Sequence, residues 1–327
     1  MMFRNFFSIL LVLLVFTQNS HSQGGMDDYR NAMGHFNKDE FHKALENYSS
    51  AIKKFDKFAE AYYYRGICHF KTGRPDLAIY DYEKFKKYYK PDNGSDAVSG
   101  IIDKPSADSS YLPVFARAYL IRGKQSAKKN NYTLASRHFE KSISIDPENP
   151  LGFIELGMIK IETGEFREAV NDLERARILD DSLPAVFTGI GKANFKMGEQ
   201  AAAHENFNHA LSLDSNYAPA YYEIGMLHFT NKKFQKATDL FLKAIRKDSI
   251  YPEAYFALGN AQFKMKKFDE AIRQLNKAIN LRKDFAEAYY CRGNVKFEMG
   301  HKRAACTDWQ QARYLGKQET AEKIRKY

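Results

Sequence analysis

Apolar and polar positions repeat with a period of 34 residues along most of this chain. Residues 252–285 show the pattern clearly, because their apolar and small side chains are spaced as on one face of two consecutive α-helices. Numbered from Pro252, the pattern occupies positions 4, 7, 8, 11, 17, 20, 24 and 27, which are Tyr255, Leu258, Gly259, Gln262, Phe268, Ala271, Leu275 and Ala278. The spacing predicts a hairpin of two short helices, helix A and helix B, in each 34-residue unit.

Three positions recur in eight copies of the unit. Position 20 is always Ala and position 24 is aromatic or Leu. Position 8 is always small, and its residues are Ala32, Gly66, Gly123, Gly157, Gly191, Gly225, Gly259 and Gly293. Small residues at positions 8 and 20 let the two helices approach closely, and a bulky residue there would cost about 1–3 kcal/mol through overpacking.

This pattern resembles the tetratricopeptide repeat (TPR) family. The resemblance implies an all-α fold, a right-handed α-solenoid superhelix of eight TPR helical hairpins with a C-terminal capping helix. We place repeats 1 and 2 at residues 25–92 and repeats 3 to 8 at residues 116–315. Between them, residues 93–115 are rich in Gly, Ser, Asp and Pro and are expected to form an irregular insert, and residues 316–327 are expected to form the cap.

The N-terminus has the pattern of a secretory signal peptide, assigned to residues 1–22. Arg4 precedes an apolar run at residues 6–16, and small and polar residues follow up to Ser22. A run of this length is short for a membrane-spanning helix, which needs roughly 20 apolar residues. The expected result is an exported protein, periplasmic or secreted, with an uncleaved signal anchor as the alternative.

Charge and cysteine content narrow the function classes only slightly. The formal net charge is +10, which is typical of a lysine-rich solvated surface, and no Arg-rich or aromatic signature of nucleic-acid binding accompanies it. Cys291 and Cys306 fall on the two helices of one repeat, so a disulfide in an oxidising compartment is an alternative to two free thiols.

Repeats 2 and 8 share a pair of opposite charges. Arg65 with Asp81, and Arg292 with Asp308, occupy positions 7 and 23. Because an antiparallel hairpin brings these positions together, each pair is interpreted as an interhelical ion pair, and the alternative is an exposed anion-binding arginine.

No catalytic constellation emerges from the sequence. The glycines belong to the repeat rather than to a phosphate-binding loop, and the histidines lack metal-ligand spacing. The chain is therefore predicted to be a non-enzymatic scaffold that uses neither a cofactor nor a metal ion.

A second stripe of helix A, at positions 5, 9, 12 and 13, is the candidate binding site. In TPR proteins the corresponding stripe lines a concave groove, which implies that the partner is an extended or amphipathic protein segment. The predicted groove residues are Lys124, Lys128, Lys192, Lys196, Tyr222, Phe256, Asn260, Lys264, Tyr290 and Asn294. The alternative function is binding of an anionic polymer or an envelope surface through the five lysines of this set.

Overall fold

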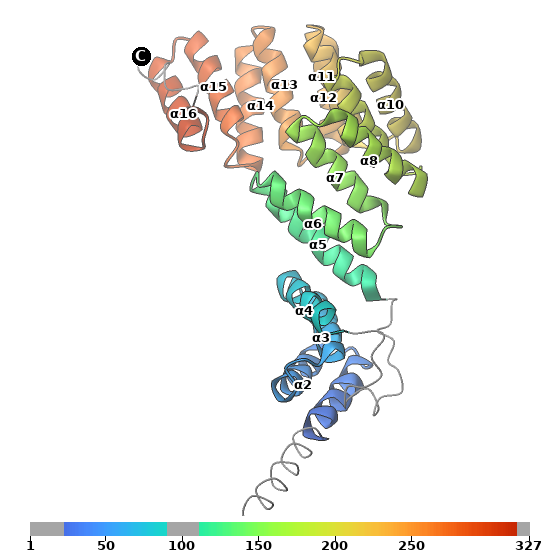
Figure 1. Cartoon of the computed structure of the whole chain (residues 1–327). Coiled ribbons are helices and arrows are strands. Elements are labelled where there is room, and N and C mark those ends of the chain that lie inside the picture. The colour runs from blue at the N-terminus through green and yellow to red at the C-terminus, as the bar shows by residue number, and fades with distance from the viewer. Residues whose placement is uncertain (1–22, 90–110, 319–327) are drawn as a thin grey trace, which may run out of the picture. The chain divides into compact units, whose positions relative to one another are not determined.

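The computed structural model describes residues 23–89 and 111–318. The chain divides into two compact units between Ile159 and Lys160, and each unit is described by itself. All the regular structure in the described ranges is helical, without a strand (Figure 1). The predicted all-α class is therefore confirmed.

The first unit is built from consecutive helical hairpins. Its opening helix covers residues 23–36. The following helices are α2 (Phe41–Lys54), α3 (Ala59–Lys71), α4 (Pro75–Tyr88), α5 (Leu112–Lys128), α6 (Tyr132–Ile145) and the greater part of α7 (Pro150–Thr163).

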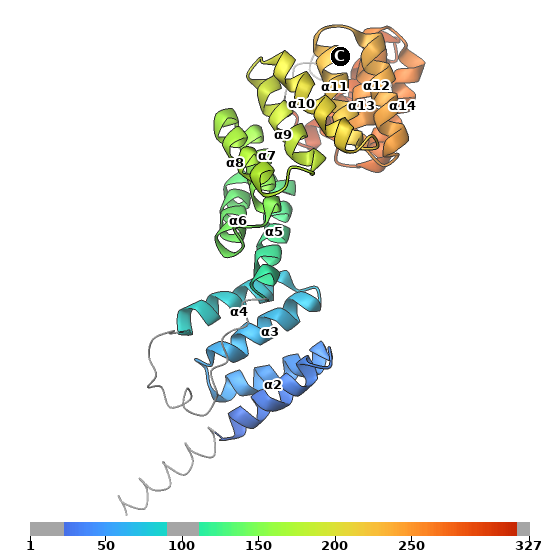
Figure 2. The ribbon, with the colours of Figure 1, turned by 90° about the vertical axis from the view of Figure 1, so that its right-hand side faces the viewer.

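The second unit continues the same arrangement, and both views show α11 beside α12 and α13 beside α14 (Figures 1 and 2). After the end of α7 come α8 (Phe166–Leu179), α9 (Pro184–Lys196), α10 (Gln200–Leu213), α11 (Ala218–Thr230), α12 (Phe234–Lys247), α13 (Pro252–Lys264), α14 (Phe268–Leu281), α15 (Ala286–Glu298) and α16 (Lys302–Tyr314). Several A helices carry proline in their first turn, where the missing N–H has no helical partner to lose. The chain is an α-solenoid of consecutive hairpins.

Glycine at position 8 brings helix A into direct contact with helix B. A Cβ atom on Gly123 would lie 2.3 Å from Cε1 of Phe139. A Cβ atom on Gly259 would lie 2.9 Å from Cγ of Leu275 and 3.1 Å from the carbonyl oxygen of Ala271. The expected close approach of the two helices at positions 8 and 20 is confirmed in both units.

Every hairpin turn has a left-handed residue at position 15. This residue is glycine in four turns, with φ between 77° and 91° at Gly73, Gly164, Gly198 and Gly300. In the other four turns, φ lies between 57° and 60° at Asp39, Asn130, Lys232 and Lys266. Asn and Asp tolerate this conformation better than other residues with a side chain, so the two lysines are the unusual choices.

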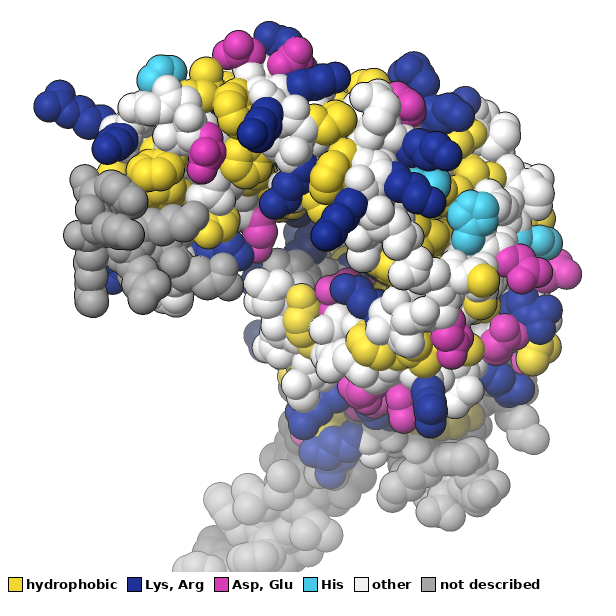
Figure 3. Space-filling model, turned by 90° about the horizontal axis from the view of Figure 1, so that it is seen from above, with side chains coloured by type: hydrophobic (Ala, Val, Ile, Leu, Met, Phe, Trp, Pro, Cys, Tyr) yellow, Lys and Arg dark blue, Asp and Glu magenta, His cyan; other side chains and the backbone are white. Residues whose placement is uncertain are grey.

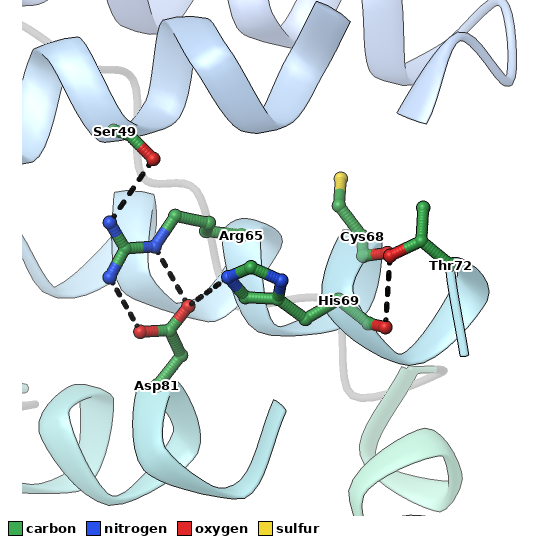
Figure 4. A network of polar contacts seen from close by, with 6 residues as sticks. All are labelled: Ser49, Arg65, Cys68, His69, Thr72 and Asp81. Carbon is green, nitrogen blue, oxygen red and sulfur yellow. Dashed lines mark hydrogen bonds and ion pairs between the residues drawn. The ribbon is translucent and has the colours of Figure 1, made fainter. Parts of the chain in front are cut away.

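Repeat 2 contains a buried ion pair between its two helices (Figure 4). Arg65 donates from Nε and Nη2 to the two carboxylate oxygens of Asp81, at 2.8 and 2.7 Å, and from Nη1 to Oγ of Ser49 at 3.3 Å. Nε2 of His69 lies 3.7 Å from the same carboxylate. Burial raises the pKa of Asp81 against the opposing influence of Arg65, and burial together with Arg65 and Arg74 lowers the pKa of His69 to about 4.

Repeat 8 contains the same pair in the same geometry. Arg292 donates from Nε and Nη2 to Asp308 at 2.8 and 2.6 Å, and from Nη1 to Oδ1 of Asn276 at 2.6 Å. Lys296 adds a second cation, with Nζ 2.8 Å from Oδ2 of Asp308. The interpretation of positions 7 and 23 as interhelical ion pairs is therefore confirmed in both repeats.

One boundary differs from the sequence prediction. Helix α5 begins at Leu112, so residues 112–115, which were assigned to the insert, form its first turn. Pro113 suits that turn, and the fully buried ring of Phe115 stacks on Tyr82 of repeat 2 with 4.5 Å between the ring centroids. Packing against the preceding hairpin therefore extends the helix into a segment whose composition suggested a loop.

Three other sequence predictions fall wholly or largely outside the described residues. They are the signal peptide at residues 1–22, the remainder of the insert up to residue 110, and the C-terminal cap beyond residue 318.

Cys291 and Cys306 are both free thiols, and burial raises the pKa of Cys291 to about 12.

Candidate partner-binding surface

The residues predicted to line the groove all lie on A helices, but they are divided between the two units. Lys124 and Lys128 belong to α5 in the first unit, and the other eight belong to α9, α11, α13 and α15 in the second. The second unit therefore holds the part of the predicted site that can form one surface.

The aromatic residues at position 5 pack against aromatic residues that precede the next repeat. The ring centroids of Tyr222 and Tyr251 are 5.3 Å apart, and those of Phe256 and Phe285 are 5.1 Å apart. Tyr222 and Phe256 are half-buried, so each ring contributes to packing and still presents part of its surface to solvent. Two such pairs on successive hairpins form a repeated aromatic surface.

An arginine lies over this aromatic surface. The Arg282 guanidinium is 3.5 Å from the ring centroid of Phe285, and its Nη1 is 2.7 Å from Oε1 of Glu253. A cation over an aromatic face is attracted by the ring quadrupole, and the ion pair holds the guanidinium in place. Partly exposed aromatic side chains next to arginine are typical of interface hot spots.

Four residues of this surface were not predicted from the sequence, namely Tyr251, Glu253, Arg282 and Phe285. A signal for two of them was present, because position 34 of the unit is a large apolar residue in five repeats. These residues are Phe58, Leu183, Tyr217, Tyr251 and Phe285. Position 34 follows helix B, and its packing against position 5 of the same repeat becomes visible only in three dimensions.

The two predicted amides are engaged within the protein. Oδ1 of Asn294 accepts a hydrogen bond from the Trp309 indole at 3.2 Å, which ties α15 to α16. Oδ1 of Asn260 lies 3.9 Å from the Cys291 thiol of the next repeat. Both amides therefore help to join helices in addition to any contact with a partner.

The lysines at position 9 are neutralised by ion pairs. Nζ of Lys124 is 2.8 Å from Glu155 in the first unit. In the second unit, Nζ of Lys192 lies 3.8 Å from carboxylate oxygens of both Glu162 and Glu223. Burial raises the pKa of Glu223, while Lys192 and Lys196 act in the opposite direction. These pairs weaken the alternative in which groove lysines bind an anionic polymer.

The lysines at position 13 have a different environment. Lys128, Lys196 and Lys264 are exposed, and each lies at or next to the C-terminal end of its A helix, close to the hairpin turn. Tyr290, at position 5 of repeat 8, has the Lys317 ammonium 5.5 Å from its ring centroid.

The described ranges contain neither a cluster of metal-ligating side chains nor a membrane-spanning helix. No group of three or more His, Cys, Asp or Glu side chains in them is placed to hold a metal ion. No helix in that part of the chain is both long and apolar enough to cross a membrane.

The fold defines an α-solenoid repeat protein built from consecutive helical hairpins. Models described as "Tetratricopeptide repeat" match residues 29–94, 116–149, 188–255 and 240–273, and one described as "TPR repeat" matches residues 263–300. The chain belongs to the tetratricopeptide repeat family. No curated protein sequence matches it.

Solved structures agree with the fold. The Cut9–Hcn1 hetero-tetramer of the APC/C matches with a TM-score of 0.57 and 15% identity, over 91% of this chain and 75% of that chain. A TPR protein from Parabacteroides merdae matches with a TM-score of 0.51 and 14% identity, over 93% and 98% of the two chains. PilF of Pseudomonas aeruginosa matches with a TM-score of 0.50 and 16% identity, over 67% and 99%. At these identities the likeness concerns the fold alone.

Proposed function

We propose that this protein is an exported, non-enzymatic scaffold that binds an extended or amphipathic segment of a protein partner. The proposed binding surface is the A-helix stripe of the second unit. The proposal rests on two aromatic contacts, Tyr222–Tyr251 and Phe256–Phe285, with Arg282 over the ring of Phe285. Membership of a family that typically mediates protein–protein interaction supports it.

The partner segment would place apolar side chains against these rings and polar groups against the neighbouring charges. Arg282 and Glu253 offer a fixed cation and a fixed anion at one end of α13. Aromatic rings lose little conformational entropy on binding, so a few of them contribute a large share of interface affinity.

Site-specific photocrosslinking tests the surface. A benzophenone amino acid is placed at Phe256 in the full-length protein in its native host, and a second protein carries it at Leu242. Leu242 is an exposed apolar residue on helix B of the preceding repeat and provides the matched control. The proposal requires a crosslinked partner that is specific to position 256. Identical crosslinking patterns at both positions would refute the assignment of the surface.

A substitution series measures the energetic contribution. The triple variant Tyr222→Ala, Phe256→Ala and Tyr290→Ala is expected to lose partner binding by at least tenfold, because each ring is a candidate hot spot. The triple variant Leu213→Ala, Leu242→Ala and Leu281→Ala removes three exposed apolar side chains from B helices and should retain binding. Circular dichroism on both variants shows whether any loss comes from unfolding.

Export is proposed from the N-terminal sequence. The apolar run at residues 6–16 and the polar residues up to Ser22 support cleavage before Gln23. Intact-mass measurement of the protein purified from its native host tests this proposal. A mature chain beginning at Gln23 in the exported fraction is expected, and a full-length chain in the cytoplasmic fraction would contradict export.

A further inference from the structure

The hairpin turns of repeats 6 to 8 carry a concentration of unpaired positive charge. We name these residues the turn edge: Lys232, Lys233, Lys236, Lys266, Lys267 and Arg303. All six are exposed. Among the described residues, none of them has a carboxylate within the 4.0 Å ion-pair distance, in contrast to Lys192 in the same unit.

The topology gathers these turns on one side of the second unit. Helices α11, α13 and α15 are consecutive A helices, and α13 packs beside both of the others. Because each A helix runs in the same direction, the turns that follow them lie along one edge. In a view from above, Lys and Arg side chains are spread over the visible face among apolar, acidic and uncharged polar side chains (Figure 3).

Acidic residues do little to offset this charge. The turn segment 230–236 contains three lysines and no Asp or Glu. The segment 264–270 contains three lysines, and its two acidic residues, Asp269 and Glu270, lie in the first turn of α14. The positive charge also affects His228. Burial lowers the pKa of His228, and the charges of Lys233, Lys236 and His204 lower it further.

Backbone conformation provides the second, independent observation. Lys232 and Lys266 occupy position 15, with φ of 57° and 60°, where four other repeats have glycine. Lysine is disfavoured in this conformation, whereas glycine adopts it freely. Two adjacent repeats therefore have a charged residue at a strained position of the turn, where glycine would be unstrained. Residues held in strained backbone conformations cluster at functional positions.

The composition of the turn edge distinguishes between classes of anionic partner. Lysine is depleted in protein–protein interfaces, and none of the exposed large hydrophobic residues of the described chain lies in these three turns. Single-stranded nucleic acid is bound by stacking on exposed aromatic rings, but Phe229, Phe263 and Phe297 beside the turns are partly buried. Hydrated point charges at exposed turns fit the headgroup region of an anionic membrane.

We propose that the turn edge of repeats 6 to 8 binds the surface of a membrane that contains anionic lipids. This activity is separate from the partner-binding surface on the A helices. It orients the second unit with its hairpin turns toward the lipid and leaves the aromatic surface of α11 and α13 available to a partner.

The test compares two full-length variants that lose the same charge. In Lys232→Gly/Lys266→Gly, glycine keeps the turn conformation, so this variant loses two charges without losing the fold. In Arg273→Gln/Lys277→Gln, two exposed cations are removed from the outer face of α14 in the same unit. The N-terminal apolar run is common to both variants, so its contribution to lipid binding cancels in the comparison.

Co-flotation with vesicles gives the readout. On vesicles of mixed phosphatidylcholine and phosphatidylglycerol, the glycine variant should bind roughly 30-fold more weakly, since each lysine near an anionic surface contributes about fivefold. The glutamine variant should bind within a factor of about two of the original protein because its charges lie away from the turns. High salt should abolish the difference between the two variants, and vesicles of phosphatidylcholine alone should show none.

Three results would overturn the proposal. One is equal binding of both variants to the anionic vesicles. Another is a difference between the variants on neutral vesicles that is as large as their difference on anionic vesicles. The third is a loss by the glycine variant only on labelled polyuridylate or polyglutamate, which would assign the turn edge to nucleic acid or to an acidic protein. Crosslinking of a partner at Phe256 should be unaffected in the glycine variant, so the two proposals fail independently.

Discussion

Repeats 2 and 8 contain the same buried arginine–aspartate pair in different electrostatic settings. In repeat 2 the third side chain is His69, which is held neutral by burial and by nearby arginines. In repeat 8 the corresponding position 11 carries Lys296, whose ammonium contacts Asp308 at 2.8 Å. The aspartate therefore has one charged partner in repeat 2 and two in repeat 8.

The comparison separates the roles of three positions. Positions 7 and 23 fix the geometry, because both arginines bind both carboxylate oxygens and reach a polar side chain at position 25 of the preceding repeat. Position 11 sets the charge of the network and its response to pH. The same scaffold contact therefore has a titratable histidine beside it in repeat 2 and a lysine in repeat 8.

Removing the aspartate should have the largest effect. Asp81→Ala and Asp308→Ala each leave a mostly buried arginine without its counter-ion, which costs about 3–5 kcal/mol in such settings. Hydrogen exchange of α3 and α4, or of α15 and α16, should show a loss of protection confined to the altered repeat and its neighbours. Replacing both partners by apolar residues, as in Arg65→Met/Asp81→Leu, should restore most of the protection, and a double variant as unstable as Asp81→Ala would contradict this account.

Acidification should also distinguish repeat 2 from repeat 8, with a smaller loss of stability than the aspartate substitutions cause. The pKa of His69 is lowered in the fold to about 4 from an ordinary value near 6.5, so the unfolded state binds more protons between these values. Above about pH 6.5, His69 is neutral in both the folded and the unfolded state and costs no stability. As the pH drops toward 4, the titration of His69 lowers the free energy of unfolding of repeat 2 by up to about 3 kcal/mol.

The histidine contribution is measured by comparing the original protein with His69→Gln. Asp81 has a raised pKa and shifts stability in the opposite direction on acidification, but it is present in both proteins and cancels. Hydrogen exchange of α3 and α4, corrected for the intrinsic rate at each pH, should lose its acid sensitivity in the glutamine variant. An unchanged pH profile would show that His69 does not titrate as described.

Overpacking at position 8 is expected to have the next largest effect on the free energy of unfolding. The effect should be larger in repeat 8 than in repeat 2. A Cβ atom at Gly293 would lie 2.6 Å from Cδ1 of Trp309, whereas one at Gly66 would meet Phe115 at 2.9 Å. Gly293→Ala and Gly66→Ala should each destabilise by about 1–3 kcal/mol in urea denaturation, with the larger value for Gly293. Gly34→Ala is the control, because nothing lies within 4 Å of the added methyl group, and it should be neutral or slightly stabilising.

The smallest expected effects concern the hairpin turns. Lys232→Gly and Lys266→Gly should each stabilise the protein by about 1 kcal/mol, because glycine relieves the left-handed strain. In repeat 8, Gly300→Lys should destabilise by a similar amount. Urea denaturation checks both directions, and a Lys232→Gly variant that is less stable than the original would remove the argument for strain.

The fold and the buried ion pairs could be predicted from the sequence because they depend on spacing within one unit. Gly259 and Ala271 define the hairpin contact, and positions 7 and 23 of an antiparallel hairpin must face each other. The start of α5 could not be predicted, since Phe115 packs on Tyr82 across an insert without periodic spacing.

The candidate surface was predicted less completely, for the same reason. The placement of Arg282 over Phe285 arises in a connection between repeats, where helical periodicity gives no information. Ion pairing of Lys192 depends on Glu162 in one neighbouring repeat and on Glu223 in the other. Contacts of this kind follow from the stacking of repeats rather than from the pattern inside each one.

The hydrogen bond from Arg292 to Asn276 has a consequence for how the C-terminal end of the chain opens. Arg292 and Asp308 join the two helices of repeat 8, and the 2.6 Å bond to Asn276 fastens both to α14 of repeat 7. In a linear array each repeat is stabilised mainly by its neighbours, and repeat 8 is the last one that the structure describes. This bond makes the opening of α15 and α16 cooperative with α14, so a protease acting on native chains should cut the three helices together rather than trim repeat 8 residue by residue.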